Sequence, residues 1–169
     1  MAAGGNFAVQ PYMFEPESDP EQEEVTEEVV VCRLRQDVSE WCTCGNCTAM
    51  PTSPENLCCR EIPKVLRRLN QLQNPPSCMA DHPGFEPVCL NVFSLQKALN
   101  IYRADYGPLR LRGREHRYRY LAYRSFVSWC WGFLGRRLRV PLPSCVVRRI
   151  RIEYPDAEGI YVGFRPALD

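Results

Sequence analysis

The sequence predicts a mainly helical α+β fold, in which a loop-rich cysteine region lies between a disordered acidic N-terminal tail and the helices. Apolar residues recur at helical spacing in several segments after residue 60, and one short segment near the C-terminus alternates as a strand does. The third observation is the presence of ten cysteines among 169 residues. A chain of this length suits a single domain with a tail.

Charge divides the chain into two parts. Residues 1–32 hold eight acidic residues and no Lys or Arg, whereas the remainder holds all 21 Lys and Arg. Because residues 1–30 are acidic and lack a periodic apolar pattern, we expect a disordered tail there and one domain over residues 31–169. Tyr12, Met13 and Phe14 make this tail a candidate docking segment for a protein partner, although plain disorder is the simpler interpretation.

The apolar periodicity places the first two helices. Residues 61–73 have helical spacing, with Pro63 in the first turn and Pro75–Pro76 after the end. Residues 94–106 form a second candidate, which Ser94 would cap and Gly107 would end. The segments 29–60 and 74–91 contain many turn-forming residues and are expected to be loops.

The C-terminal third completes the fold prediction. Residues 115–134 are the longest helix candidate, with Gly135 at its C-terminal end and Arg117, Arg119 and Arg124 expected on its polar sides. Residues 143–152 favour a helix over a strand, because Pro143 suits a first turn. Ile160, Val162 and Phe164 alternate with other residues, so a short strand is expected there and supplies the β part of the prediction.

Seven cysteines form the main chemical pattern. No apolar run reaches the roughly 18–20 residues of a membrane span, and the N-terminus lacks the features of a signal peptide. We therefore expect a cytoplasmic protein, with the nucleus left open, in which clustered thiols bind metal rather than form disulfides. Two tetrahedral Zn²⁺ ions that share one thiolate need seven ligands. The sequence thus predicts a structural dinuclear zinc cluster held by Cys42, Cys44, Cys47, Cys58, Cys59, Cys78 and Cys145.

The other candidate ligands are weaker. An iron–sulfur cluster also uses thiolates, but this spacing does not match the common ferredoxin patterns. His82 is a lesser alternative ligand, because a lone His beside Pro is more often a structural hydrogen-bonding group. Cys89 and Cys130 lie among apolar residues and are expected in the core, whereas Cys32 suits either the core or an unpaired thiol.

Arginine dominates the basic residues. Residues 110–151 hold twelve Arg and one acid, Glu115. This composition fits a phosphate-bearing ligand, a nucleic acid helped by the interleaved tyrosines, or internal pairing with the cluster and the acidic tail. No phosphate-binding loop or catalytic motif is apparent, and all-thiolate zinc sites are usually closed. The sequence therefore predicts a non-enzymatic module.

Several motifs carry a resemblance to a known family. The order WCTCGNC, LCCRE, AYRSF..W, LPSC and Y.GF resembles the cytosolic C-terminal ballast domain of the subtype-seven P2X purinoceptors, over about residues 41–164. The stretches HPGFEPVCLN and YRYLAYRSFVSWCWGFLGR are closer still to the free-standing P2X purinoceptor 7-like proteins. The resemblance implies a mainly helical domain whose zinc ligands are the same seven cysteines.

The resemblance also implies a guanine nucleotide, GDP or GTP, as a ligand. Its contacts map to Arg119, Tyr120, Tyr123, Val140, Leu142, Val162 and Gly163. Tyr120 stands where the family has histidine, and Asp156 where it has lysine, which weakens the nucleotide prediction unless Arg148, Arg149 or Arg151 compensates. The expected function is thus a regulatory or scaffolding zinc module that binds a guanine nucleotide; the alternative is a nucleic-acid-binding zinc protein that uses the Arg-rich region 110–151.

Overall fold

The computed structural model of this chain describes residues 33–134 and 138–165. The predicted acidic tail, Cys32 and Gly135 lie outside these ranges. In chain order the helical elements are α2 (Val38–Trp41), η1 (Ser53–Glu55), η2 (Cys59–Glu61), α3 (Pro63–Leu69), η3 (Met79–Asp81), η4 (Glu86–Leu90), α4 (Val92–Tyr106), α5 (Arg114–Trp131) and α6 (Ser144–Glu153). No helix of the described residues is long and apolar enough to span a bilayer.

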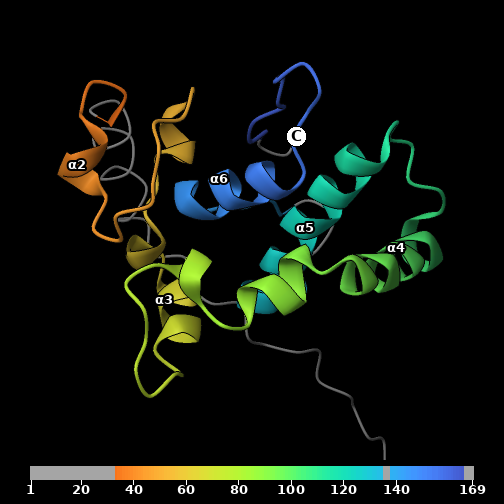
Figure 1. The fold of residues 1–169 in the computed structure, drawn as a ribbon, viewed down its shortest axis with the longest axis horizontal. Coiled ribbons are helices and arrows are strands. Elements are labelled where there is room, and N and C mark those ends of the chain that lie inside the picture. The colour runs from red at the N-terminus through yellow and green to blue at the C-terminus, as the bar shows by residue number, and fades with distance from the viewer. Residues whose placement is uncertain (1–32, 135–137, 166–169) are drawn as a thin grey trace, which may run out of the picture.

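Helix α5 occupies the centre of the fold. It contacts α3, α4, α6 and the short η4 segment, and α2 with the cysteine loop lies at the opposite end of the molecule from α4 (Figure 1). Phe126 of α5 is fully buried, and its ring packs edge-on against Phe85 at 6.0 Å between centroids. Leu121 of α5, Leu95 of α4 and Ile150 of α6 extend this core. Burying each such side chain stabilises the fold by about 1.5–3 kcal/mol.

The predicted helices after residue 60 are present, with different ends. Asn91, not Ser94, caps α4: its side chain accepts hydrogen bonds from the N–H groups of Phe93 and Ser94, at 2.9 and 3.2 Å. The Ser94 hydroxyl instead donates to the Pro87 carbonyl at 2.6 Å. Helix α5 stops at Trp131, because Gly132 adopts a left-handed φ of 76° that ends the helix before the predicted boundary.

The predicted strand near the C-terminus is wrong, and with it the β part of the fold class. The described residues contain helices and irregular segments but no strand. The apolar side chains of Ile160 and Val162 are 67% and 61% exposed, so their alternation does not mark a buried sheet face. The backbone N–H of Ile160 donates to the Asp156 carboxylate and that of Phe164 to Glu55, so side chains take the place of a neighbouring strand.

Two further expectations need correction. The segment 74–91 is not all loop, because η3 and the π-helical turn η4 lie within it, and η4 buries Cys89 and Leu90. In α5, Arg119 was expected on a polar side but is only 5% exposed. Its Nη1 donates to the Tyr154 carbonyl at 2.9 Å, which compensates for burying the guanidinium.

Candidate metal centre

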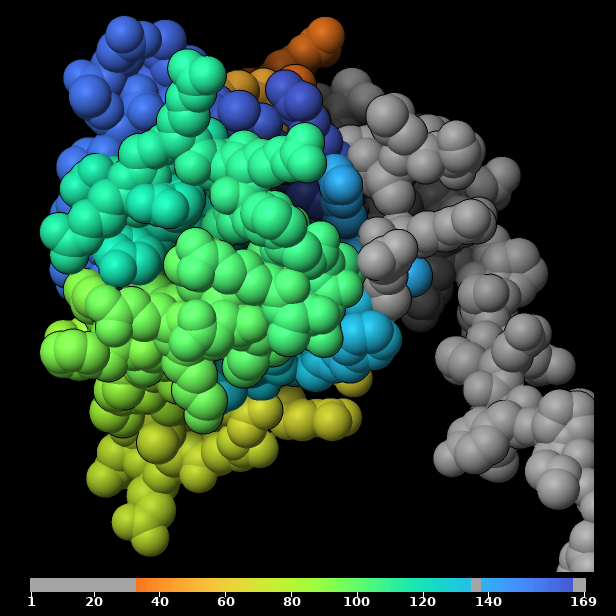
Figure 2. Space-filling model, turned by 90° about the vertical axis from the view of Figure 1, so that its right-hand side faces the viewer, coloured from red at the N-terminus to blue at the C-terminus, as the bar shows by residue number. Residues whose placement is uncertain are grey.

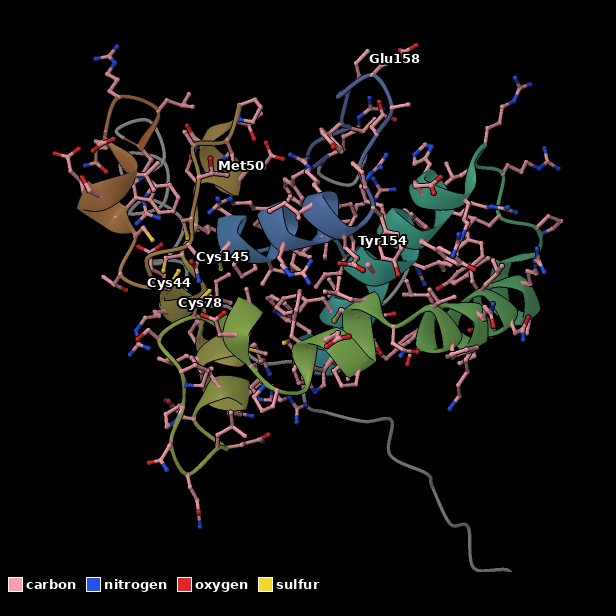
Figure 3. The ribbon with its side chains drawn as sticks, viewed as in Figure 1. Cys44, Met50, Cys78, Cys145, Tyr154 and Glu158 are labelled. Atoms are coloured by element: carbon pink, nitrogen blue, oxygen red, sulfur yellow. The ribbon has the colours of Figure 1, made fainter. Side chains whose placement is uncertain are left out.

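The seven predicted ligands come from four separate parts of the chain. Cys42, Cys44 and Cys47 lie in the loop after α2, where Gly45 has a φ of 84° that suits a tight turn. The others lie at η2, η3 and α6: Cys58 and Cys59 begin η2, Cys78 caps η3, and Cys145 is in the first turn of α6. Figure 3 shows Cys44, Cys78 and Cys145 close together beside the start of α6.

The sulfur atoms form two sets of four that share one member. One set comprises Cys42, Cys44, Cys47 and Cys58, and the other comprises Cys44, Cys59, Cys78 and Cys145. Within each set, all the sulfur atoms lie within 4.8 Å of one another. The second set is fully buried, and we call it the inner set. Cys42 and Cys47 of the first set are half-buried, and we call that set the outer set. The Cys44 sulfur is therefore the atom that the two sets share.

The spacing of the sulfurs suits a tetrahedral metal site. Two thiolates bound to one Zn²⁺ at about 2.3 Å are separated by about 3.8 Å in tetrahedral geometry. The Cys44 Sγ lies 3.7 Å from the Cys42 Sγ and 3.6 Å from the Cys47 Sγ. A disulfide would need about 2.05 Å, and all nine cysteines of the described residues are free thiols. The donor set therefore fits zinc in both chemistry and spacing.

Backbone groups already point at two of the inner sulfurs. The N–H of Met79 donates to the Cys59 Sγ at 3.4 Å, and the N–H of Ala80 donates to the Cys78 Sγ at 3.3 Å. Such hydrogen bonds stabilise thiolate charge and orient metal ligands. The η3 turn thus holds the inner set through its backbone.

Two residues that the sequence analysis missed hold the cysteine loop in place. The Ser144 hydroxyl accepts from the N–H of Thr48 at 2.9 Å and donates to the Thr48 carbonyl at 2.5 Å, which joins α6 to the loop. Glu61 accepts from the N–H of Cys58 at 3.0 Å and pairs with Arg33 at 2.5 Å. The Ser in LPSC and the Glu in LCCRE were visible signals, but Thr48 and Arg33, with which they join distant segments, are far away in sequence.

The thiols have divergent proton affinities because they crowd together. A hydrogen bond from the Cys145 thiol lowers the pKa of Cys44 to about 5. Burial raises the pKa of Cys42 to about 11. The pKa of Cys145 is raised, because its thiol donates to Cys44 and to neighbouring sulfurs. Seven thiols in this space cannot all ionise unless a cation compensates for their mutual repulsion.

The other candidate ligands lie outside both sulfur sets. The Nδ1 of His82 accepts from the N–H of Gly84 at 2.8 Å, and its ring packs edge-on against Trp129. This agrees with the structural role that was weighed against ligation for His82. Cys89 and Cys130 are buried in the core, as predicted.

Only part of the predicted nucleotide set comes together. Arg119 and Tyr123 of α5 face α6, where the Arg151 Nε donates to the Tyr123 hydroxyl at 3.3 Å. The ring of Tyr161 lies against both guanidiniums, 4.9 Å from the Cζ of Arg119 and 4.5 Å from that of Arg151. Asp156 pairs with Arg119 at 3.9 Å, so its carboxylate lies beside the guanidinium that was expected to contact the nucleotide.

The remaining predicted contacts lie apart from this group. Tyr120 faces α4, where it packs edge-on against Tyr102 and lines an open pocket of about 340 Å³. Val162 is exposed, and Gly163 lies so close to Glu55 that an added Cβ would sit 2.6 Å from its Oε1. Val140 and Leu142 are half-buried in the segment that leads into α6. Of the bases expected to compensate for Asp156, Arg148 donates to the Asn46 carbonyl and Arg149 pairs with Glu153, which leaves Arg151 beside Arg119.

The fold and the sulfur sets define a mainly helical domain with a clustered-cysteine centre. Residues 6–165 match the family model of the P2X purinoreceptor 7 intracellular domain, and the chain belongs to this family. It is 34% identical to mouse P2X purinoceptor 7 over 76% of its length, and 31% identical to the rat protein over 86%. The chain spans about a fifth of the length of these relatives, at 20% and 23%. The family and its intracellular location agree with the expectations from the sequence.

Proposed function

We propose that this chain is a non-enzymatic regulatory or scaffolding module whose fold depends on two Zn²⁺ ions held by the seven cysteines. The observation that carries the proposal is the arrangement of seven sulfurs in two sets of four that share Cys44. Thiolates are the ligands that select zinc over hard cations, and four protein ligands per ion close each site to water. Closed sites of this kind stabilise structure rather than activate a nucleophile.

Zinc would bind where several short elements of the chain meet. The loop after α2, the η2 and η3 turns and the start of α6 meet at the cysteines (Figure 3). Because metal binding energy becomes folding energy, the ions would hold these short elements together in addition to the apolar contacts that they make. The module would then present α4, α5 and α6 in fixed positions to a partner.

Native mass spectrometry of the reduced, full-length protein tests this proposal. We expect a mass increase equal to two zinc ions per chain, which a strong chelator removes together with the helical circular dichroism signal. Elemental analysis would identify the metal. A folded chain without metal, or one that absorbs visible light as an iron–sulfur protein does, would overturn it.

Guanine nucleotide binding is the finer part of the proposal. Arg119 and Arg151 are two guanidiniums on neighbouring helices that both lie against the Tyr161 ring, a pairing suited to phosphate, and Arg151 also donates to the Tyr123 hydroxyl. The Tyr161 ring now lies against both, so a nucleotide would have to displace it. We expect GDP or GTP to bind more tightly than ATP, and Arg151→Gln to weaken binding at least tenfold. The exposed Arg103→Gln variant is the control, and equal binding by both variants would refute this site.

A nucleic-acid function is the second candidate, favoured by one observation. Arg110, Arg112 and Arg114 are exposed and make no ion pair within the described ranges. Arg110 and Arg112 lie in the segment between α4 and α5, and Arg114 begins α5. This segment is on the face that Figure 2 shows. Binding of single-stranded RNA that falls steeply with salt, and that is lost when all three become Gln, would support this function. Binding that these changes leave intact would exclude this surface.

A further inference from the structure

The segment after α6 contains a tyrosine whose setting differs from that of the others. Among the tyrosines in the described ranges, those at 102, 106, 118, 120 and 123 lie within α4 and α5. Tyr154 is buried, and its hydroxyl donates to the Leu90 carbonyl. Tyr161 is half-buried in an irregular segment between the exposed residues Ile160 and Val162. A modifying enzyme can therefore bind the backbone around it without unfolding a helix.

The hydrogen bonds of this segment are mostly made within it: the Asp156 carboxylate accepts from the N–H groups of Glu158 and Ile160, and it also pairs with Arg119 at 3.9 Å. The Tyr161 hydroxyl accepts one hydrogen bond, from the N–H of Asp156 at 3.1 Å. Farther along, the N–H of Phe164 donates to Glu55 at 2.8 Å. The loop that carries Glu158 extends away from the helices (Figure 3). Few of its backbone hydrogen bonds reach the rest of the described residues, and irregular segments of this kind open locally at a lower cost in free energy than packed helices do.

Tyr161 follows acidic residues in the sequence but lies against basic residues in the structure. Glu153, Asp156 and Glu158 precede it, and residues 152–164 contain no base. An acidic segment of this kind complements a basic substrate groove. In the structure, however, the Tyr161 ring lies against the guanidiniums of Arg119 and Arg151. Arg119 donates one N–H to the Tyr154 carbonyl and pairs with Asp156 at 3.9 Å, and Arg151 donates one N–H to Tyr123. The two guanidiniums carry ten N–H groups between them, so others remain for an anion.

We propose that Tyr161 is a site of tyrosine phosphorylation and that Arg119 and Arg151 bind the resulting phosphate. A protein tyrosine kinase would transfer the γ-phosphoryl group of ATP to the phenolic oxygen. The bond between the γ-phosphorus and the β–γ bridging oxygen breaks, an O–P bond forms, ADP leaves, and the phenolic proton passes to the base of the kinase. The phosphate adds a charge of about −1.5 to −2, which suits two arginines. The inference does not depend on zinc or nucleotide binding.

The first test uses the folded, full-length protein, a recombinant tyrosine kinase and MgATP, with peptide mapping of the product. We expect Tyr161 to carry most of the phosphate, and Tyr161→Phe to reduce incorporation at least tenfold. Tyr120→Phe is the control, because Tyr120 lies within α5, and it should leave incorporation unchanged. Phosphate spread over the helical tyrosines, or none on the folded protein when a peptide of residues 153–165 is a good substrate, would overturn the site.

The second test concerns the arginines and uses phosphorus NMR on the phosphorylated protein. The second pKa of free phosphotyrosine is about 6, and two paired guanidiniums should lower it. We expect Arg151→Gln to move this pKa back toward the free value, whereas Arg148→Gln on the same helix leaves it unchanged. A phosphate that titrates like free phosphotyrosine in all three proteins would overturn the role of Arg119 and Arg151.

Discussion

Replacing Cys44 by serine should remove both metal ions, whereas replacing Cys42 should remove one. Cys44 belongs to both sulfur sets, and Cys42 belongs to the half-buried set alone. The Cys44→Ser variant leaves three sulfurs in each set, while Cys42→Ser leaves the inner four intact. The two variants change the same kind of atom in the same loop, so the difference between them isolates the shared position.

The expected magnitudes follow from binding and folding energies. A structural Zn²⁺ contributes about 10–16 kcal/mol of apparent binding free energy in small zinc domains. The net stability of a domain is only about 5–15 kcal/mol. Loss of both ions should therefore leave Cys44→Ser without a cooperative thermal transition. Cys42→Ser should stay folded at a lower melting temperature, because the inner set still ties η2, η3 and α6 together.

The assay combines metal content with thermal melts. We expect zinc per chain to fall from two in the parent protein to one in Cys42→Ser and to none in Cys44→Ser. Cys130→Ala is the control, because this buried thiol lies in neither set, and it should keep two ions. A Cys44→Ser protein that holds two ions, or that melts like the parent, would refute the reasoning.

Three predictions concern the helical part and can be tested by urea denaturation. Phe126→Ala should cost about 3–5 kcal/mol, because the fully buried ring leaves a cavity at the centre of α5; a cost below 1 kcal/mol would contradict the central role of α5. Asn91→Ala should cost about 0.5–2 kcal/mol by uncapping α4, whereas Ser94→Ala should cost less. Burial lowers the pKa of His82, so its contribution to stability is complete above pH 6.5 and is lost as the pH falls through its pKa in the folded state. His82→Gln should remove that part of the pH dependence of the unfolding free energy, and an unchanged pH dependence would show that His82 is not its source.

Local pattern predicted the helices well and their surroundings less well. Residues 94–106 and 143–152 were placed from apolar spacing and from turn residues, which are signals within a few positions. The cap at Asn91 was missed because Ser94 satisfies the same local rule, and only the Pro87 carbonyl draws its hydroxyl away. The burial of Arg119 depends on the Tyr154 carbonyl, 35 positions later, and a one-dimensional pattern does not contain that contact.

The candidate site shows the same division between local and distant information. The number of cysteines predicts two ions that share one sulfur, but it does not indicate which sulfur is shared. That choice depends on Cys59, Cys78 and Cys145 reaching Cys44 from three other elements. The strand expected at 160–164 is wrong for a related reason: the apolar alternation is present in the sequence, but residues 33–134 and 138–165 contain no strand to pair with it.

The way the two sulfur sets are distributed along the chain has a consequence for synthesis. The outer set lies within residues 42–58, so its four thiols leave the ribosome together and would complete the first of the two proposed zinc sites. The inner set stays incomplete until α6 has been made, because Cys145 follows more than 80 residues after Cys59. Closing so long a loop costs conformational entropy, and domains fold from the N-terminus during translation. Zinc loading would therefore be sequential: the outer site would fill first, and the inner site would fill only after α6 has been synthesised.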